Sequence, residues 1–87
     1  MKINCELIET KLQLHEYIAK ELNFPEYYGK NLDALYDLLT ERSEETLIEL
    51  INFEKLKETF GIYADAFLDT IMDASLENVL INVKVNR

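Results

Sequence analysis

The chain has 87 residues, of which 48% are hydrophobic, and it contains only two glycines and one proline. This composition excludes a disordered or collagen-like protein and predicts one globular domain over residues 1–87, because half of so short a chain could not build its own core. Seventeen acidic residues against nine basic ones give a net charge of −8, which disfavours binding to nucleic acid or to an anionic membrane and favours a basic protein partner.

Cysteine content and hydropathy bear on the cellular compartment. Cys5 has no second cysteine with which to form an intramolecular disulfide, and no run of about 18 apolar residues is present that could cross a bilayer. The first residues also lack the long apolar segment of a secretory signal. We therefore expect a protein of the reducing cytoplasm.

The N-terminal segment predicts a strand followed by a helix. Apolar and polar side chains alternate over residues 2–7, which is typical of a half-buried strand and places Leu7 on its inner face. Thr10 and Gln13 have the spacing of a capping box, in which two side chains satisfy free amide groups at a helix start. The helix is expected to continue to about Leu22.

A loop rich in aromatic residues follows over residues 24–29. Pro25 disfavours helical backbone at the residue before it, and Gly29 is expected to provide a left-handed conformation. Asn31 is a favourable N-cap for a second helix over residues 32–41. The polar side of that helix carries three acids, Asp33, Asp37 and Glu41.

The rest of the chain predicts a strand over residues 46–52, a short helix over 53–59 that stops at Gly61, a longer helix to about Leu76 and a strand over 79–85. The apolar face of the longer helix is formed by Tyr63, Ala64, Phe67, Leu68, Ile71, Met72 and Ala74. The order strand, helix, helix, strand, helix, helix, strand is typical of an α/β fold with a parallel sheet and helical crossovers.

Residues suited to catalysis are few. His15 lies on the same side of its helix as Ile18 and Leu22, so a hydrogen-bonded core histidine is favoured over a general base. Cys5 is interpreted as a small core residue rather than a nucleophile. Neither glycine belongs to a phosphate-binding loop, and no histidine and cysteine spacing suits zinc. We predict a protein that is not an enzyme and needs no cofactor.

Carboxylates are concentrated between residues 26 and 49, a segment that contains seven acidic and two basic residues. Asp33 and Asp37 lie one turn apart on one helical face, a like-charge arrangement that costs roughly 0.2–0.5 kcal/mol. Neighbouring tyrosines add the aromatic character of binding hot spots, which favours a protein interface. A solvated face, a divalent metal site and an acid–base pair are the alternatives. A second acidic row, Asp65, Asp69 and Asp73, is mostly explained as a solvated face.

The run from Leu22 to Asp37 contains Pro-Glu-Tyr-Tyr-Gly-x-Asn-Leu-Asp-Ala-Leu-aromatic-Asp. This motif resembles the signature of the barstar family, the intracellular inhibitors of barnase-type secreted ribonucleases, and the predicted order of strands and helices agrees over nearly all of the chain. The resemblance implies a small α/β fold with a three-stranded parallel sheet and about four helices. It also implies that the aromatic loop and the second helix block a ribonuclease active site.

The resemblance further implies which residues contact the partner. They lie in the loop, the second helix, the following link and the last helix: Tyr27, Tyr28, Gly29, Asn31, Leu32, Asp33, Tyr36, Asp37, Thr40, Glu44 and Asp73. Asp37 would enter the phosphate-binding pocket and meet its arginine and lysine side chains. Asp33 would pair with a neighbouring cation or main-chain donor, and Tyr27 would pack near the catalytic histidine. Tyr36 stands where the archetype has tryptophan, and residues 42–45 lack its interface tryptophan.

The sequence therefore predicts a cytoplasmic inhibitor, monomeric when free, of a basic, guanyl-preferring ribonuclease of the secreted or toxin type. The alternative is an acidic adaptor of the same fold that binds another basic protein and inhibits no nuclease.

Overall fold

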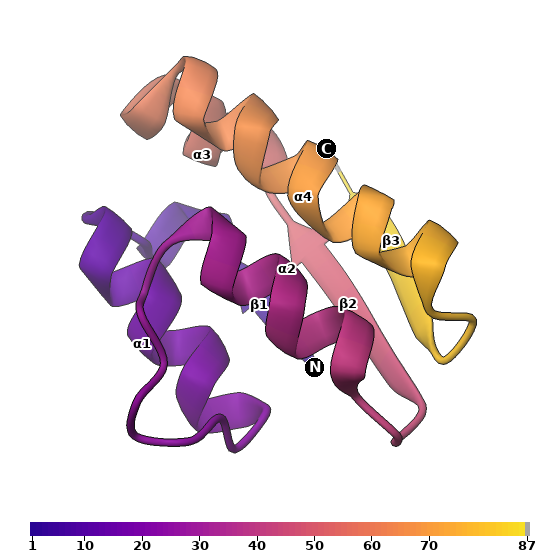
Figure 1. Cartoon of the computed structure of the whole chain (residues 1–87). Helices are drawn as coiled ribbons and strands as arrows, with labels where there is room; N and C mark the ends of the chain where they lie inside the picture. Colours follow the sequence, from indigo (N-terminus) through magenta and orange to yellow (C-terminus); the bar gives the residue numbers. More distant parts are fainter. Residues whose placement is uncertain (87) are drawn as a thin grey trace.

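The computed structural model describes residues 1–86. Within them the elements follow the order β1 (Lys2–Asn4), a 3-10 turn η1 (Cys5–Leu7), α1 (Lys11–Glu21), α2 (Leu32–Glu41), β2 (Thr46–Ile51), α3 (Phe53–Phe60), α4 (Ile62–Glu77) and β3 (Ile81–Asn86) (Figure 1). The strands pair in parallel in the order β1-β2-β3. The predicted α/β fold, with a three-stranded parallel sheet and four α-helices, is confirmed.

One face of the sheet carries the core. In β2, Ile48 and Leu50 are buried, whereas Leu47, on the opposite face, is 46% exposed. Helices α2 and α4 lie side by side over the buried face (Figure 1). Parallel sheets are usually covered on both faces, so this sheet is unusual in leaving one face largely uncovered, and the helices that carry the acidic residues all belong to a single layer.

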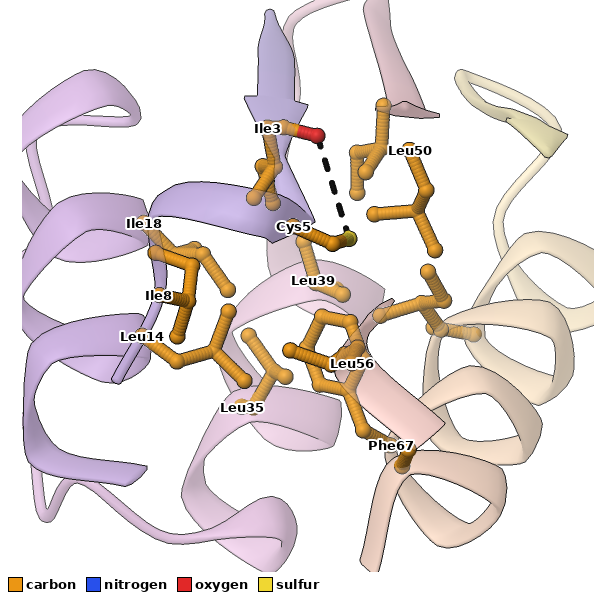
Figure 2. Close-up of a cluster of buried hydrophobic side chains, with 14 of the residues drawn as sticks. Ile3, Cys5, Ile8, Leu14, Ile18, Leu35, Leu39, Leu50, Leu56 and Phe67 are labelled. Atoms are coloured by element: carbon orange, nitrogen blue, oxygen red, sulfur yellow. Dashed lines mark hydrogen bonds between the residues drawn. The ribbon is translucent and has the colours of Figure 1, made fainter. Parts of the chain in front are cut away.

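The core cluster in Figure 2 joins β1, η1 and the helices. Cys5 is 1% exposed, and its Sγ lies 3.9 Å from the carbonyl oxygen of Ile3. Burial raises the pKa of the Cys5 thiol to about 11. At neutral pH the thiol is therefore protonated and unreactive, which agrees with its interpretation as a core residue.

The first strand is shorter than predicted. Its pairing ends where Asn4 lies opposite Ile51, the last residue of β2, and Asn52 then turns the chain with a left-handed φ of 59°. The Asn4 side chain accepts a hydrogen bond from the Glu6 amide at 3.2 Å, which starts the 3-10 turn. The prediction that Leu7 lies on an inner strand face is wrong, because its side chain is 66% exposed.

Two further predictions near the C-terminus are wrong. Val79 lies in a turn before β3 and is 88% exposed, because the Asn78 side chain accepts a hydrogen bond from the Leu80 amide and holds the chain out of the sheet until Ile81. Met72 is 44% exposed and does not belong to the buried face of α4. Among residues 1–86, no helix has the length and hydropathy needed to cross a membrane.

Candidate partner-binding site

The aromatic loop (residues 23–30) leads into α2 through a tight turn. Gly29 does not adopt the left-handed conformation expected from the sequence; Asn23 and Lys30 do, with φ of 54° and 53°. A Cβ atom at position 29 would lie 3.1 Å from Asn31 Nδ2, so any larger residue would press on the side chain that caps α2. Asn31 in turn accepts a hydrogen bond from the Ala34 amide at 2.8 Å. Its role as the N-cap of α2 is confirmed.

We expect Asn31→Ala to lower the free energy of unfolding by about 1 kcal/mol, the usual effect of removing an N-cap side chain. Chemical denaturation measures this change. Asn31→Asp keeps an oxygen that can accept the Ala34 amide and should lie close to wild type. Equal losses in the two variants would contradict the capping role.

The two predicted carboxylates of α2 are both exposed. Asp33 lies in the first turn of α2, where the partial positive charge of the helix N-terminus stabilises an acid and offsets part of its repulsion with Asp37. Within residues 1–86, the ion pairs are Glu16–Lys30, Arg42–Glu44, Lys55–Glu58 and Lys57–Asp65. None of them includes Asp33 or Asp37, so both carboxylates are available to an external cation.

Tyr36 marks where α2 meets α4. Burial raises the pKa of its hydroxyl, and the carboxylates of Glu77, Asp73 and Asp37 raise it further. Three acids from two helices therefore act on one half-buried tyrosine, and we call Asp37, Asp73 and Glu77 the acidic cluster. Asp73 was predicted as a contact residue; Glu77 was not, although it continues the four-residue spacing of the acidic row on α4.

A groove of about 260 Å³ runs between the aromatic loop and α2, with Tyr27, Tyr28, Gly29 and Asp37 among the residues that line it. Tyr27 is 82% exposed. Tyr28 is only 6% exposed, so its side chain supports the loop from inside. Leu32 is half-buried beside the core. The groove thus places an exposed aromatic side chain and a carboxylate next to each other.

Two of the predicted contacts, Thr40 and Glu44, have internal partners. The Thr40 hydroxyl donates to the carbonyl oxygen of Asp37 at 3.0 Å. Glu44 is exposed, but its carboxylate lies 3.3 Å from the Arg42 guanidinium. Arg42 also donates to the Leu22 carbonyl and to the Thr46 hydroxyl, both at 2.9 Å. Glu44 is therefore partly neutralised, in contrast to Asp37.

Asn78, which no motif in the sequence marks, joins the ends of α2 and α4. Its Nδ2 donates to the carbonyl oxygens of Leu39, Thr40 and Arg42 at 3.0, 3.4 and 2.9 Å, and these carbonyls lie at the C-terminal end of α2. Such carbonyls have no partner within their own helix. One amide from the end of α4 thus bonds the C-terminal end of α2 and links the two helices that carry the acidic cluster.

A metal site receives no support from the described part of the chain. Residues 1–86 contain no group of three or more histidine, cysteine, aspartate or glutamate side chains arranged to hold a metal ion. Two carboxylates, such as Asp33 and Asp37, supply too few ligands for the six to eight oxygens of a calcium site.

Comparison with known proteins decides the family. Residues 1–86 match the family described as Barstar (barnase inhibitor). This chain belongs to the barstar family. A relative from Bacillus subtilis (strain 168), named "Putative ribonuclease inhibitor YrdF", is 45% identical over 65 residues, which cover 74% of this chain and 71% of the relative.

Membership of the barstar family makes this chain a ribonuclease inhibitor and confirms the prediction that it is not an enzyme. The family match covers the acidic helices as well as the sheet. Which residues of this barstar-family protein touch a ribonuclease stays a prediction.

Proposed function

We propose that this protein blocks the active site of a basic, guanyl-preferring ribonuclease by placing carboxylates where an RNA phosphate would bind. Two observations carry the proposal: Asp37 is exposed and lines the groove beside Tyr27, and Asp37, Asp73 and Glu77, from two helices, all raise the pKa of the Tyr36 hydroxyl. No ion pair within residues 1–86 neutralises any of the three. Carboxylates gathered in this way are costly in the free protein and favourable opposite cations.

A ribonuclease active site offers the matching chemistry, because a pocket that binds phosphate presents cationic side chains and amide donors. A guanidinium 4 Å from one carboxylate is attracted by about 4 kcal/mol at an effective dielectric of 20, before the cost of desolvation is subtracted. This attraction exceeds the few tenths of a kcal/mol by which Asp33 and Asp37 repel each other. Binding therefore converts a repulsive arrangement into an attractive one.

The groove beside the acidic cluster supplies the apolar part of the interface. Tyr27 is exposed on the loop side and Asp37 lines the α2 side. Aromatic side chains at the centre of an interface contribute much of its affinity. We therefore place Tyr27 and Asp37 at the centre of the contact, with Asp33, Gly29 and the α4 acids around them and Glu44 at the rim.

The proposed partner is a secreted or toxin-type nuclease, and the proposed place of action is the cytoplasm of the cell that makes it, where the enzyme would otherwise cleave the cell's own RNA. We propose that the inhibitor folds as one domain and acts as a monomer, with one inhibitor per nuclease. An isothermal titration that gives a molar ratio of one, together with a monomeric sedimentation coefficient for the free protein, would agree with this stoichiometry.

Titration of a guanyl-specific ribonuclease tests the function. We expect activity on a dinucleotide substrate to fall linearly to zero at one equivalent of inhibitor, and a saturating substrate analogue to slow binding because the two compete for one site. If the nuclease keeps full activity when an excess of this protein is added and binding is observed, active-site blocking is contradicted and the adaptor alternative is favoured.

Salt provides a second test, because net charge and the acidic cluster should attract a basic partner before contact. We expect the association rate constant to fall by at least about tenfold between low ionic strength and about 0.5 M salt, while the dissociation rate constant changes much less. Stopped-flow measurement of both constants checks this prediction. An association rate that is independent of salt would exclude electrostatic steering.

A further inference from the structure

The chain's one histidine, His15, is buried beneath the aromatic loop. It lies on α1 and is 1% exposed. Its Nδ1 is 2.6 Å from the hydroxyl of Tyr28 in the loop, and its Nε2 is 2.7 Å from the hydroxyl of Tyr63 at the start of α4. One imidazole ring thus connects α1, α4 and the loop.

Tyr28 is the residue through which the loop is held. Its ring packs edge-on against Phe24 with centroids 4.9 Å apart, and its amide donates to the Pro25 carbonyl at 3.0 Å. The loop backbone also contains two non-glycine residues with left-handed φ, Asn23 and Lys30, a conformation that needs support from surrounding contacts. The exposed Tyr27 directly precedes this anchored residue.

A donor and an acceptor can be assigned in each of the two hydrogen bonds of His15. A neutral imidazole has one donor and one acceptor nitrogen. Tyr28 is 6% exposed, and within residues 1–86 the partner of its hydroxyl is His15, so we assign its proton to the hydrogen bond with Nδ1. Nε2 then carries the ring proton and donates to Tyr63, which is only half-buried and can direct its own proton to water. This arrangement satisfies every donor.

We propose that His15 is a positioning residue of the binding site: by accepting the Tyr28 hydroxyl at Nδ1, it fixes the aromatic loop, and with it Tyr27 and the groove, against α1 and α4. The inference rests on the proposed function only in that the loop contacts the ribonuclease. His15 itself is buried and touches no partner.

The arrangement should respond to pH. Protonated His15 donates from both nitrogens and can no longer accept from Tyr28. Burial lowers the pKa of His15 below its usual 6.5, whereas burial raises the pKa of Tyr28, with Tyr63 adding to the rise, and burial also raises the pKa of Tyr63. Both hydroxyls therefore keep their protons. Lys11, whose Nζ lies 4.4 Å from the centre of the Tyr63 ring, is the cation beside this network.

The shifted pKa of His15 fixes the direction in which stability changes with pH. The folded protein holds the His15 proton less tightly than the unfolded chain, so the stabilisation is complete above pH 6.5 and is lost progressively as the pH falls below that value. Because the bond that protonation breaks is the one to Tyr28, the aromatic loop should loosen first.

Amide exchange in the free protein tests the inference without a ribonuclease. We expect Tyr28→Phe to raise the exchange rate of the residue 28 amide at least about tenfold at pH 7.5, an opening of the loop that leaves most of the fold closed. Tyr63→Phe removes the same atom from the other side of His15 and should leave the loop less affected. Equal exchange rates for the residue 28 amide in Tyr28→Phe and wild type would overturn the proposal.

A pH profile separates positioning from general stability. In wild type, protection of the residue 28 amide should fall as the pH is lowered below 6.5, and the dissociation rate of the ribonuclease complex should rise with the same pH dependence. In His15→Gln, whose side chain does not titrate, both trends should be absent or much weaker. A loop that responds to pH identically in both proteins would overturn the role of His15. Loop protection that changes as expected, without any inhibition of the nuclease, would instead contradict the proposed function.

Discussion

Asp37→Asn should weaken binding to the inhibited ribonuclease at least about 30-fold, a loss of more than about 2 kcal/mol, which is the threshold of an interface hot spot. Asparagine keeps the shape of the side chain but removes its charge. The change should appear mainly in the dissociation rate, because a carboxylate at the centre of an interface makes contacts that hold the complex together.

The position of Asp37 explains why this carboxylate should matter more than its neighbours. It belongs both to the acidic cluster around Tyr36 and to the groove lined by Tyr27. Asp33 is one turn away at the start of α2, and Glu44 already has Arg42 as a partner. Two acids, Asp37 and Glu41, line the groove beside Tyr27, and of these two only Asp37 also belongs to the acidic cluster.

A matched control separates local contact from net charge. Asp65→Asn makes the same change of charge at the end of α4 that faces α3, where Asp65 pairs with Lys57 at 3.5 Å. We expect it to lower the association rate slightly and to leave dissociation unchanged. Asp37→Asn should unfold at the same denaturant concentration as wild type or slightly higher, because it removes a like-charge repulsion. Equal losses of affinity in the two variants would contradict the assignment of Asp37.

Local signals predicted most of the helix boundaries. Thr10 caps α1 and accepts the Gln13 amide at 3.0 Å, Asn31 caps α2, and Gly61 ends α3 with a φ of 57°. Each of these signals lies within a few residues of the boundary that it marks, so a single sequence contains it.

The errors have both distant and local causes. Alternation over residues 2–7 predicts a single strand, but pairing stops at Asn4, opposite the end of β2 at Ile51, which is far away in sequence, and residues 5–7 form a 3-10 turn instead. The capping box correctly predicts that Thr10 caps α1. The Gln13 side chain also bonds a main-chain amide, but it accepts from Glu9, at 2.7 Å, and not from Thr10. Val79 was assigned to a strand because its β-branched side chain fits the alternation.

The residues of the candidate site also fall into those that the sequence predicts and those that depend on the packing of the helices. The motif in the loop and α2 named the exposed Tyr27 and Asp37, because a contiguous run of sequence carries them. It could not show that Tyr28 is buried and hydrogen-bonded to His15, or that Glu77 of α4 raises the pKa of Tyr36. Both facts arise from the packing of helices against each other, which no periodicity in one helix contains.

Asn78→Ala should be strongly destabilising for a substitution outside the hydrophobic core, with a loss of about 1–2 kcal/mol in the free energy of unfolding. Leaving a buried hydrogen-bonding group without a partner costs about 1–3 kcal/mol, and Asn78 serves three carbonyls of α2 and the amide of Leu80. Denaturation of the purified variant measures the loss.

The same substitution should also weaken ribonuclease binding, although Asn78 belongs to neither the groove nor the acidic cluster. Without its amide, the C-terminal ends of α2 and α4 can separate, which moves Asp73 and Glu77 away from Asp37 and leaves the bound cations with fewer carboxylates. Ser75→Ala is the matched control, because the Ser75 hydroxyl donates only to the Met72 carbonyl within α4. It should change stability and affinity little. An Asn78→Ala variant that is destabilised yet binds at wild-type affinity under folding conditions would show that the spacing of α2 and α4 does not govern recognition.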